Sequence, residues 1–77
     1  MKDIKKRFGK NVRNCRKAKE MTQVEVSSLA GLHQNYLSEI EKGKRNITLE
    51  IMQKLAEALN VEVKEFFEEN HKFRDDS

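Results

Sequence analysis

Residues 21–47 read MTQVEVSSLAGLHQNYLSEIEKGKRNI, and this stretch holds the features that decide the fold. Thr22 and Glu25 have the spacing of a capping box, in which the Thr hydroxyl accepts the backbone N–H of residue 25 and the Glu carboxylate accepts that of residue 22. A helix is therefore predicted over residues 23–30. Gly31 ends it, because the residue that follows a helix commonly needs a positive φ.

A second short helix follows almost at once. The pattern predicts it over residues 34–42, and Gly43 ends it in the same manner. Two short helices joined by about three residues must cross steeply, which is the helix-turn-helix arrangement. The apolar residues that then face a common core are Val26, Leu29, Ala30, Leu32, Leu37 and Ile40.

The rest of the 77 residues completes one small all-α domain of five helices. Further helices are predicted over residues 4–18 and 49–59, followed by a short last helix. Residues 1–69 form this domain, and residues 70–77, which lack periodicity, form a frayed tail. The inward positions are Ile4, Phe8, Val12 and Cys15 in the first helix and Leu49, Met52, Leu55, Ala56 and Leu59 in the fourth, while the last helix holds Val63, Phe66 and Phe67.

Composition argues against several classes of protein. The lone Cys15 allows no internal disulfide, and one Cys with two widely spaced His residues makes no plausible zinc site. This cysteine usage fits a reducing cytoplasm, and no apolar run approaches the length of a membrane span. No cofactor is expected. No Cys/His pair, phosphate loop or paired catalytic carboxylates point to an enzyme.

The net charge of +3 is unevenly distributed along the chain. Residues 1–20 have a net charge of +7, residues 21–60 of −1 and residues 61–77 of −3. A basic amino end and an acidic carboxyl end predict one side that faces a polyanion and one that faces away from it. An ordinary solvated helix face remains the simpler alternative on charge alone.

The helix over residues 34–42 exposes an unusual face. Solubility would be served as well by Lys and Glu, which form helices better than Asn or Ser. Gln and Asn each donate and accept hydrogen bonds, as the adenine edge in a DNA major groove requires. At 100° per residue, Leu37, Ile40 and Glu41 point inward, and the outward face holds Gln34, Asn35, Ser38, Glu39 and Lys42.

Candidate phosphate contacts flank this face. Gln23 begins the preceding helix, where backbone N–H groups and the helix dipole can receive a phosphate. Lys42, Lys44 and Arg45 follow the exposed helix, as clamps on a DNA backbone would. Each feature alone equally fits a polar surface, and Tyr36 fits a half-buried packing residue. Their occurrence together, in this order, favours a nucleic-acid interface.

The segment TQVEVSSLAGLHQNYLSEIEKGKRNITLEIMQKLAEALNV resembles the Cro/repressor-type, or lambda-repressor-like, helix-turn-helix domain. The resemblance covers about residues 8–67. Within that family, GLHQNYLSEIEKGKRNITL and the small size are most similar to the controller proteins of restriction–modification systems, which are homodimeric regulators that bind symmetric operators near their own genes. Val24 departs from the family, which usually has a polar residue there, and is expected to be exposed. His33 and Glu62 replace small polar caps.

The resemblance implies partners and residue roles. The partners are double-stranded DNA with a palindromic operator and a second copy of the chain; a contact with RNA polymerase stays open, and no membrane is involved. Arg16 and Glu41 are implied to form a structural ion pair, which we expect to be mostly buried. Base contacts are implied at Gln34 and Asn35, with further candidates at Tyr36, Ser38, Glu39 and Arg45. Phosphate contacts are implied at Gln23, Lys42, Lys44 and Asn46. Dimer contacts are implied at Val61, Val63, Phe66 and Phe67.

The leading interpretation is a sequence-specific transcription regulator that binds its operator as a homodimer and controls its own gene, with restriction–modification genes as further candidate targets. The alternative is an antitoxin that acts mainly through contact with a toxin protein. The short tail argues against that alternative, because antitoxins of this class commonly carry an additional segment that wraps the toxin. An enzyme is the third and weakest interpretation.

Overall fold

The turn between α2 (Gln23–Ala30) and α3 (Gln34–Glu41) has the geometry that the sequence predicts. The Glu25 N–H donates to Thr22 Oγ1 over 3.0 Å, and the Thr22 N–H donates to Glu25 Oε1 over 2.9 Å, so the capping box is complete. Gly31 follows α2 with φ 72° and ψ 32°, the left-handed conformation that reverses the chain. These local contacts fix where α2 begins and where it ends.

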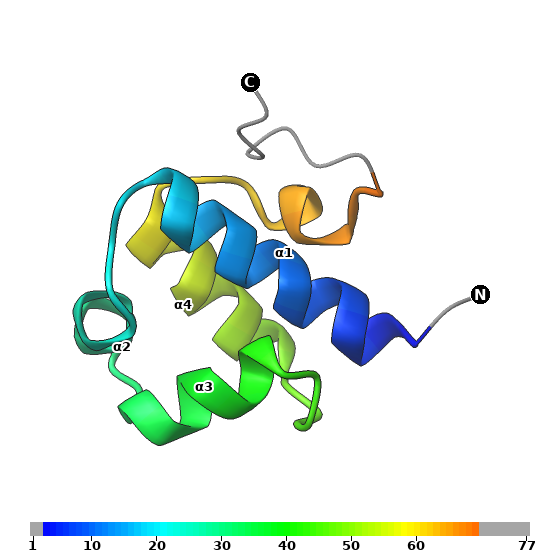
Figure 1. Ribbon diagram of the computed structural model, residues 1–77, viewed down its shortest axis with the longest axis horizontal. Helices are drawn as coiled ribbons and strands as arrows, with labels where there is room; N and C mark the ends of the chain where they lie inside the picture. The colour runs from blue at the N-terminus through cyan, green and yellow to red at the C-terminus, as the bar shows by residue number, and fades with distance from the viewer. Residues whose placement is uncertain (1–2, 70–77) are drawn as a thin grey trace.

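The structure is a computed structural model that describes residues 3–69. It contains four α-helices and a 3-10 helix, η1 (Val63–Phe67), and no strand within those residues (Figure 1). α1 (Ile4–Ala18) packs against α3 on one side and against η1 on the other, while α4 (Leu49–Leu59) lies behind it and contacts α2 (Figure 1). No helix in this part of the chain combines the length and the apolarity needed to cross a membrane.

One predicted helix type and one predicted helix boundary need correction. The expected fifth helix is the 3-10 helix η1, so the described residues hold four α-helices rather than five. α3 ends at Glu41, one residue earlier than predicted, and Lys42 is its C-cap. His33 is the N-cap of α3 and forms no side-chain capping bond. The predicted tail, residues 70–77, lies outside the described residues.

The hydrophobic core differs from the predicted one at three positions. Leu29 is 66% exposed and Leu49 is 79% exposed, so both predictions of an inward side chain were wrong. Ile4 is 42% exposed and only borders the core. Helical spacing identifies one face of each helix, but these residues lie at positions that no neighbouring element covers. The buried apolar residues are Phe8, Val12, Cys15, Val26, Ala30, Leu37, Ile40, Leu55, Ala56, Leu59 and Phe66.

A glycine sets how closely α1 and α3 approach. A Cβ atom built on Gly9 would overlap the carbonyl oxygen of Ile40 and lie 2.8 Å from that of Glu41. Glycine in the middle of a helix weakens it by about 1 kcal/mol relative to alanine, so a packing reason is expected for its presence. Here the reason is that the backbone of α3 rests directly on Gly9.

A buried amide attaches η1 to α1. Asn11 Nδ2 donates to the carbonyl oxygens of Phe66 and Glu68 over 2.8 and 2.9 Å. The Phe66 ring meets Phe8 edge-on with centroids 5.1 Å apart, and Phe66 is fully buried. We expected Phe66 at the centre of a dimer interface, but its side chain is enclosed within this chain and offers no surface to a partner.

Cys15 belongs to the same core and is chemically quiet. Its thiol is fully buried, and loss of hydration on burial raises its pKa to about 11, with Lys19 lowering the pKa and Glu65 raising it further. The thiolate is the reactive form of cysteine. The thiol therefore stays protonated at neutral pH and acts as a small apolar group.

Candidate nucleic-acid interface

α3 presents its polar residues because its apolar residues are fixed in the core. Leu37 is fully buried and Ile40 is 2% exposed, which orients the helix. On the opposite side, Gln34 and Asn35 are exposed and Ser38 is partly exposed. The predicted face of mixed hydrogen-bond donors and acceptors is therefore present on the surface. It can meet another molecule without any change in the fold.

An ion pair joins α1 to the end of α3. Arg16 Nε and Nη2 donate to Glu41 Oε2 and Oε1 over 2.8 and 3.0 Å, in a two-point contact. Arg16 is 8% exposed and Glu41 is 9% exposed. Arg16 Nη1 also donates to the carbonyl of Met21, 2.9 Å away, just before α2. A single guanidinium thus holds α1, the start of α2 and the end of α3 together.

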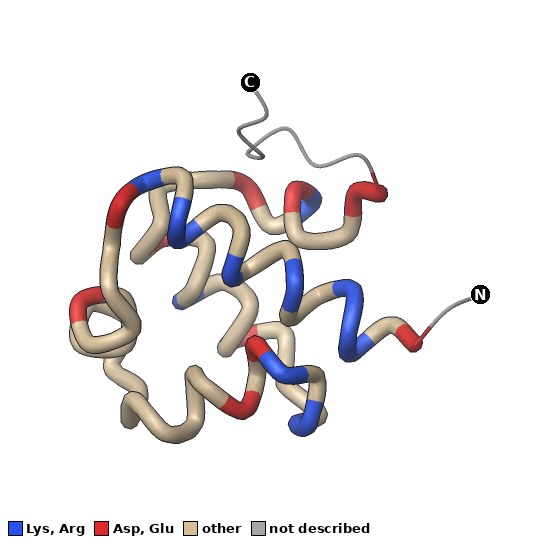
Figure 2. The backbone as a smooth tube through the Cα atoms, viewed as in Figure 1, with Lys and Arg blue, Asp and Glu red and all other residues tan. Residues whose placement is uncertain are grey.

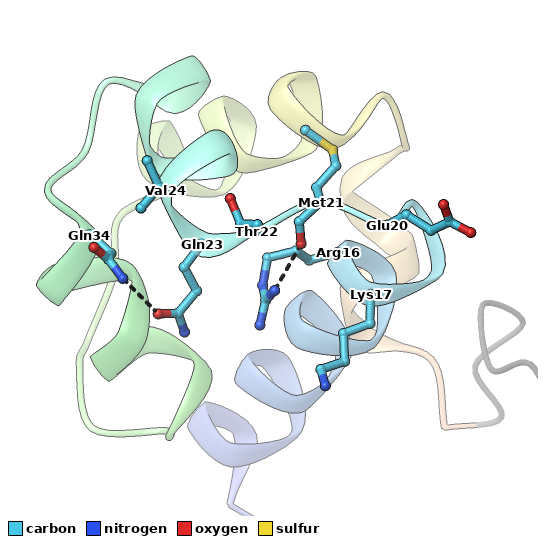
Figure 3. A pocket seen from close by; sticks show the side chains of 8 residues that line it. All are labelled: Arg16, Lys17, Glu20, Met21, Thr22, Gln23, Val24 and Gln34. Atoms are coloured by element: carbon cyan, nitrogen blue, oxygen red, sulfur yellow. Dashed lines mark hydrogen bonds between the residues drawn. The ribbon is translucent and has the colours of Figure 1, made fainter.

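The same network reaches the exposed face. Gln23 Nε2 donates to Glu41 Oε1 over 3.1 Å, and Gln34 Nε2 approaches Gln23 Oε1 at 3.5 Å. The two glutamines, one predicted to contact phosphate and the other a base, therefore lie side by side (Figure 3). They border an open hollow of about 570 Å³, which Arg16, Lys17, Glu20, Met21, Thr22 and Val24 also line.

Three of the further candidate base contacts form a cluster of their own. Arg45 Nη1 lies 3.0 Å from Glu39 Oε1, and the Arg45 guanidinium carbon lies 4.7 Å from the centre of the Tyr36 ring. The side chains of Arg45 and Glu39 are 48% and 46% exposed. In this arrangement the two charges are paired, so Arg45 and Glu39 together have no net charge and form one joined contact surface.

The loop after α3 places the remaining candidates. Lys42, Lys44 and Asn46 are all exposed, beside the polar face of α3. Gly43 adopts φ 76°, and this turn presses the loop against α1 at Lys6. The basic residues of this loop therefore lie near the basic residues of α1, whereas acidic residues gather around η1 (Figure 2).

The candidate dimer residues lie at the carboxyl end of the described chain. Val61, Val63 and Phe67 are partly exposed, unlike Phe66. Phe67 also stacks beside Phe8, with ring centroids 5.3 Å apart. Leu49 at the start of α4 adds a strongly exposed apolar side chain that we had placed in the core.

Val24 is 57% exposed, as expected from its departure from the family pattern.

Three residues that help to shape the site were not predicted from the sequence. Asn11, a polar residue on the buried side of α1, could have been recognised as a hydrogen-bonding anchor. Gly9 could have been recognised as a close contact, because a glycine inside a helix usually has a packing reason. Lys17 lines the hollow beside Gln23, and only the fold reveals that proximity.

Comparison with known proteins identifies the family. The helix-turn-helix family model matches residues 12–66. The chain is 38% identical over 61 residues to control protein C.SmaI of Serratia marcescens, covering 79% of this chain and 73% of that one. It is 36% identical over 73 residues to control protein C.MunI of a Mycoplasma species, covering 94% and 99% of the two chains.

The fold also resembles that of a restriction–modification controller protein. The crystal structure of the restriction–modification controller protein C.AhdI from Aeromonas hydrophila matches with a TM-score of 0.81 and 37% identity, over 87% of this chain and all of that one. The sequence match and the structural match therefore agree. The chain belongs to the helix-turn-helix family of transcription regulators and is related to the restriction–modification controller proteins.

Proposed function

We propose that this chain binds a two-fold symmetric DNA operator as a homodimer, with α3 in the major groove. The observation that carries the proposal is the exposed amide face of α3, held in place by the Arg16–Glu41 network. Side chains that can both donate and accept suit base edges, which present donors and acceptors in fixed patterns. Because the Arg16–Glu41 network holds α3 on its inner side, the side chains on its outer face keep a fixed position relative to the bases.

Base reading is assigned first to Gln34 and Asn35, the two exposed amides at the start of α3. Ser38 lies one turn further along the same face. Arg45 and Glu39 are the secondary readers, and they act as a pair because they are joined at 3.0 Å, with Tyr36 beneath the guanidinium. Separating this pair costs little, because exposed ion pairs contribute about 0–1 kcal/mol.

Phosphate binding is assigned to the two flanks of α3. Gln23 stands at the start of α2 on one flank, and Lys42, Lys44 and Asn46 stand in the loop on the other. Contacts of this kind position a protein on DNA without reading its sequence. Gln23 also approaches Gln34 at 3.5 Å, so a phosphate bound at Gln23 would help to orient the base-reading amide.

Dimerisation is assigned to Val61, Val63 and Phe67, supported by Leu49. One recognition helix makes few base contacts, and a two-fold dimer doubles them over half-sites about 34 Å apart. A second copy would also cover apolar side chains that a single chain leaves exposed. We place this regulator in the cytoplasm, acting on its own gene and on restriction–modification genes, with RNA polymerase as a further partner.

Selection of binding sites from a library of random DNA duplexes tests this function. We expect the selected sites to share two inverted half-sites whose centres are about one helical turn, 34 Å, apart. The wild-type chain without its partners is sufficient for this measurement. Selected sequences that share no motif would contradict the assignment of a specific DNA-binding regulator.

Analytical ultracentrifugation tests the dimer separately. We expect a dimer at protein concentrations of about 10 μM, where ordinary regulator affinities favour association. Leu49→Gln combined with Phe67→Gln should shift the protein to monomer and abolish binding to the full operator. The matched control, Lys54→Gln with Lys64→Gln, alters two other exposed side chains of α4 and η1 and should remain dimeric. A monomeric wild type would contradict the dimer.

The antitoxin alternative differs in its partner. An antitoxin would bind a toxin protein more tightly than it binds DNA, and substitutions on α3 would leave that binding intact. Co-expression of the chain with the product of the neighbouring gene, followed by co-purification, distinguishes the two functions. We expect no stable complex with that product.

A further inference from the structure

The outer face of α1 carries a row of cations that the proposed DNA contacts leave unused. Lys6, Lys10, Arg13 and Lys17 recur at i, i+4, i+7 and i+11, so at about 100° per residue they lie on one side of the helix. All four are exposed, and within residues 3–69 none of them forms an ion pair. We call these four residues the α1 ridge.

The ridge is unfavourable for the isolated helix. Like charges four residues apart on a helix repel each other, and Lys6 with Lys10 and Arg13 with Lys17 are such pairs. α1 contains no Asp or Glu that could relieve this repulsion. A face that serves only solubility usually mixes both signs of charge. A bound polyanion would relieve the repulsion, so the sequence of α1 favours such a ligand.

Both ends of the ridge meet the proposed DNA contacts. At one end, a Cβ atom built on Gly43 would lie 2.9 Å from Lys6 Cα, so the ridge begins at the loop that holds Lys44. At the other end, Lys17 lines the same hollow as Gln23 (Figure 3). With a rise of 1.5 Å per residue, the ridge extends for about 16 Å between these ends.

Charge around α1 also limits where an anion can approach. η1 lies against the opposite side of α1 from α3 and carries Glu65, with Glu62 and Glu68 on either side of it (Figure 2). Arg7 is directed toward that side, where it lies 3.3 Å from Glu69. A polyanion is therefore repelled from the η1 side and attracted to the α3 side. In the proposed complex, the polyanion on the α3 side is the DNA whose major groove holds α3.

We propose that the α1 ridge binds the phosphate backbone of the same duplex, beyond the phosphates contacted by Gln23 and the α3–α4 loop. This inference rests on the proposed function, because α3 must first dock on DNA. The ridge widens the phosphate footprint and adds affinity for any DNA sequence. Direct recognition of bases is left to α3.

The test compares two double variants with the same loss of charge. Lys10→Gln with Arg13→Gln removes the middle of the ridge, whereas Lys54→Gln with Lys64→Gln removes two exposed cations of α4 and η1. Binding to a random-sequence duplex is measured by fluorescence anisotropy across a salt series. Each lost phosphate contact reduces the slope of log Kobs against log salt by about 0.9. The ridge variant loses two cations in each protomer of the dimer, so its slope should fall by about two units per protomer, whereas the slope of the control variant should not change.

Equal slopes for the two double variants would overturn the ridge as a DNA-binding surface. Thermal unfolding of both variants separates binding from folding: removal of like charges should leave the ridge variant melting no lower than wild type. If it does melt lower, Lys10→Gln alone is measured, with an expected loss of about one unit of slope per protomer of the dimer. A wild type that selects a symmetric operator while the ridge variant keeps its slope would refute the ridge alone and leave the proposed function standing.

Discussion

Arg16→Ala is expected to lower the free energy of unfolding by roughly 3–5 kcal/mol, because it leaves Glu41 buried without its charged partner. The pair is nearly enclosed, with Arg16 8% and Glu41 9% exposed, and it makes two hydrogen bonds of 2.8 and 3.0 Å. Arg16 also holds the Met21 carbonyl, so the start of α2 loses a contact in the same variant. Urea denaturation measures the effect.

The exposed pair of Arg45 and Glu39 is the matched control. Arg45→Ala breaks an ion pair of similar length, 3.0 Å, whose side chains are about half exposed. Exposed pairs contribute about 0–1 kcal/mol, so this variant should unfold almost like wild type. Replacing both buried partners, Arg16→Met with Glu41→Leu, should recover most of the lost stability, because no uncompensated charge remains. An Arg16→Ala protein as stable as Arg45→Ala would show that the buried network does not hold α1 to α3.

Gly9→Ala is expected to lower the free energy of unfolding by about 2 kcal/mol. Forcing an extra group into a packed site costs about 1–3 kcal/mol, and the upper end applies because the blocking atoms are carbonyl oxygens of the Ile40 and Glu41 backbone. The higher helix propensity of Ala stabilises the folded state by about 1 kcal/mol relative to Gly and offsets part of this cost. The same denaturation experiment detects the loss.

Lys10→Ala provides the comparison for Gly9→Ala. It places an alanine at the next position of α1, where the side chain is exposed and nothing is displaced. We expect Lys10→Ala to change stability by less than about 0.5 kcal/mol, as is usual for surface substitutions. If Gly9→Ala also proves neutral or stabilising, the direct contact between α1 and the α3 backbone is wrong.

The local features of the fold could be predicted from sequence because they depend on neighbouring residues. The capping box of Thr22 and Glu25 and the left-handed Gly31 involve atoms within one turn of a helix. The side chains of Leu29 and Leu49 were misplaced because their exposure depends on which other helices cover them. Helical periodicity identifies the apolar face of a helix, but it does not show which part of that face a neighbouring helix covers.

The residues that form the candidate site could be predicted from the sequence, but several of the contacts between them could not. The polar face of α3 followed from helical geometry, and the Arg16–Glu41 contact was supplied by the family resemblance. The pairing of Arg45 with Glu39 depends on the path of the loop after Gly43, which local sequence does not determine. The burial of Phe66 likewise depends on Asn11, which anchors η1 from another helix.

The central claim is that α3 reads bases while its flanks bind phosphates. The most direct test measures the ratio of affinities for the selected operator and a random duplex, across a salt series, for Gln34→Ala, Asn35→Ala and Lys44→Ala. We expect Gln34→Ala and Asn35→Ala to lose about 1–3 kcal/mol on the operator and much less on random DNA, so that the ratio falls. Lys44→Ala should weaken both complexes evenly and reduce the salt slope by about one per protomer of the dimer. An unchanged ratio in both amide variants would contradict the assignment of α3 as the reading helix.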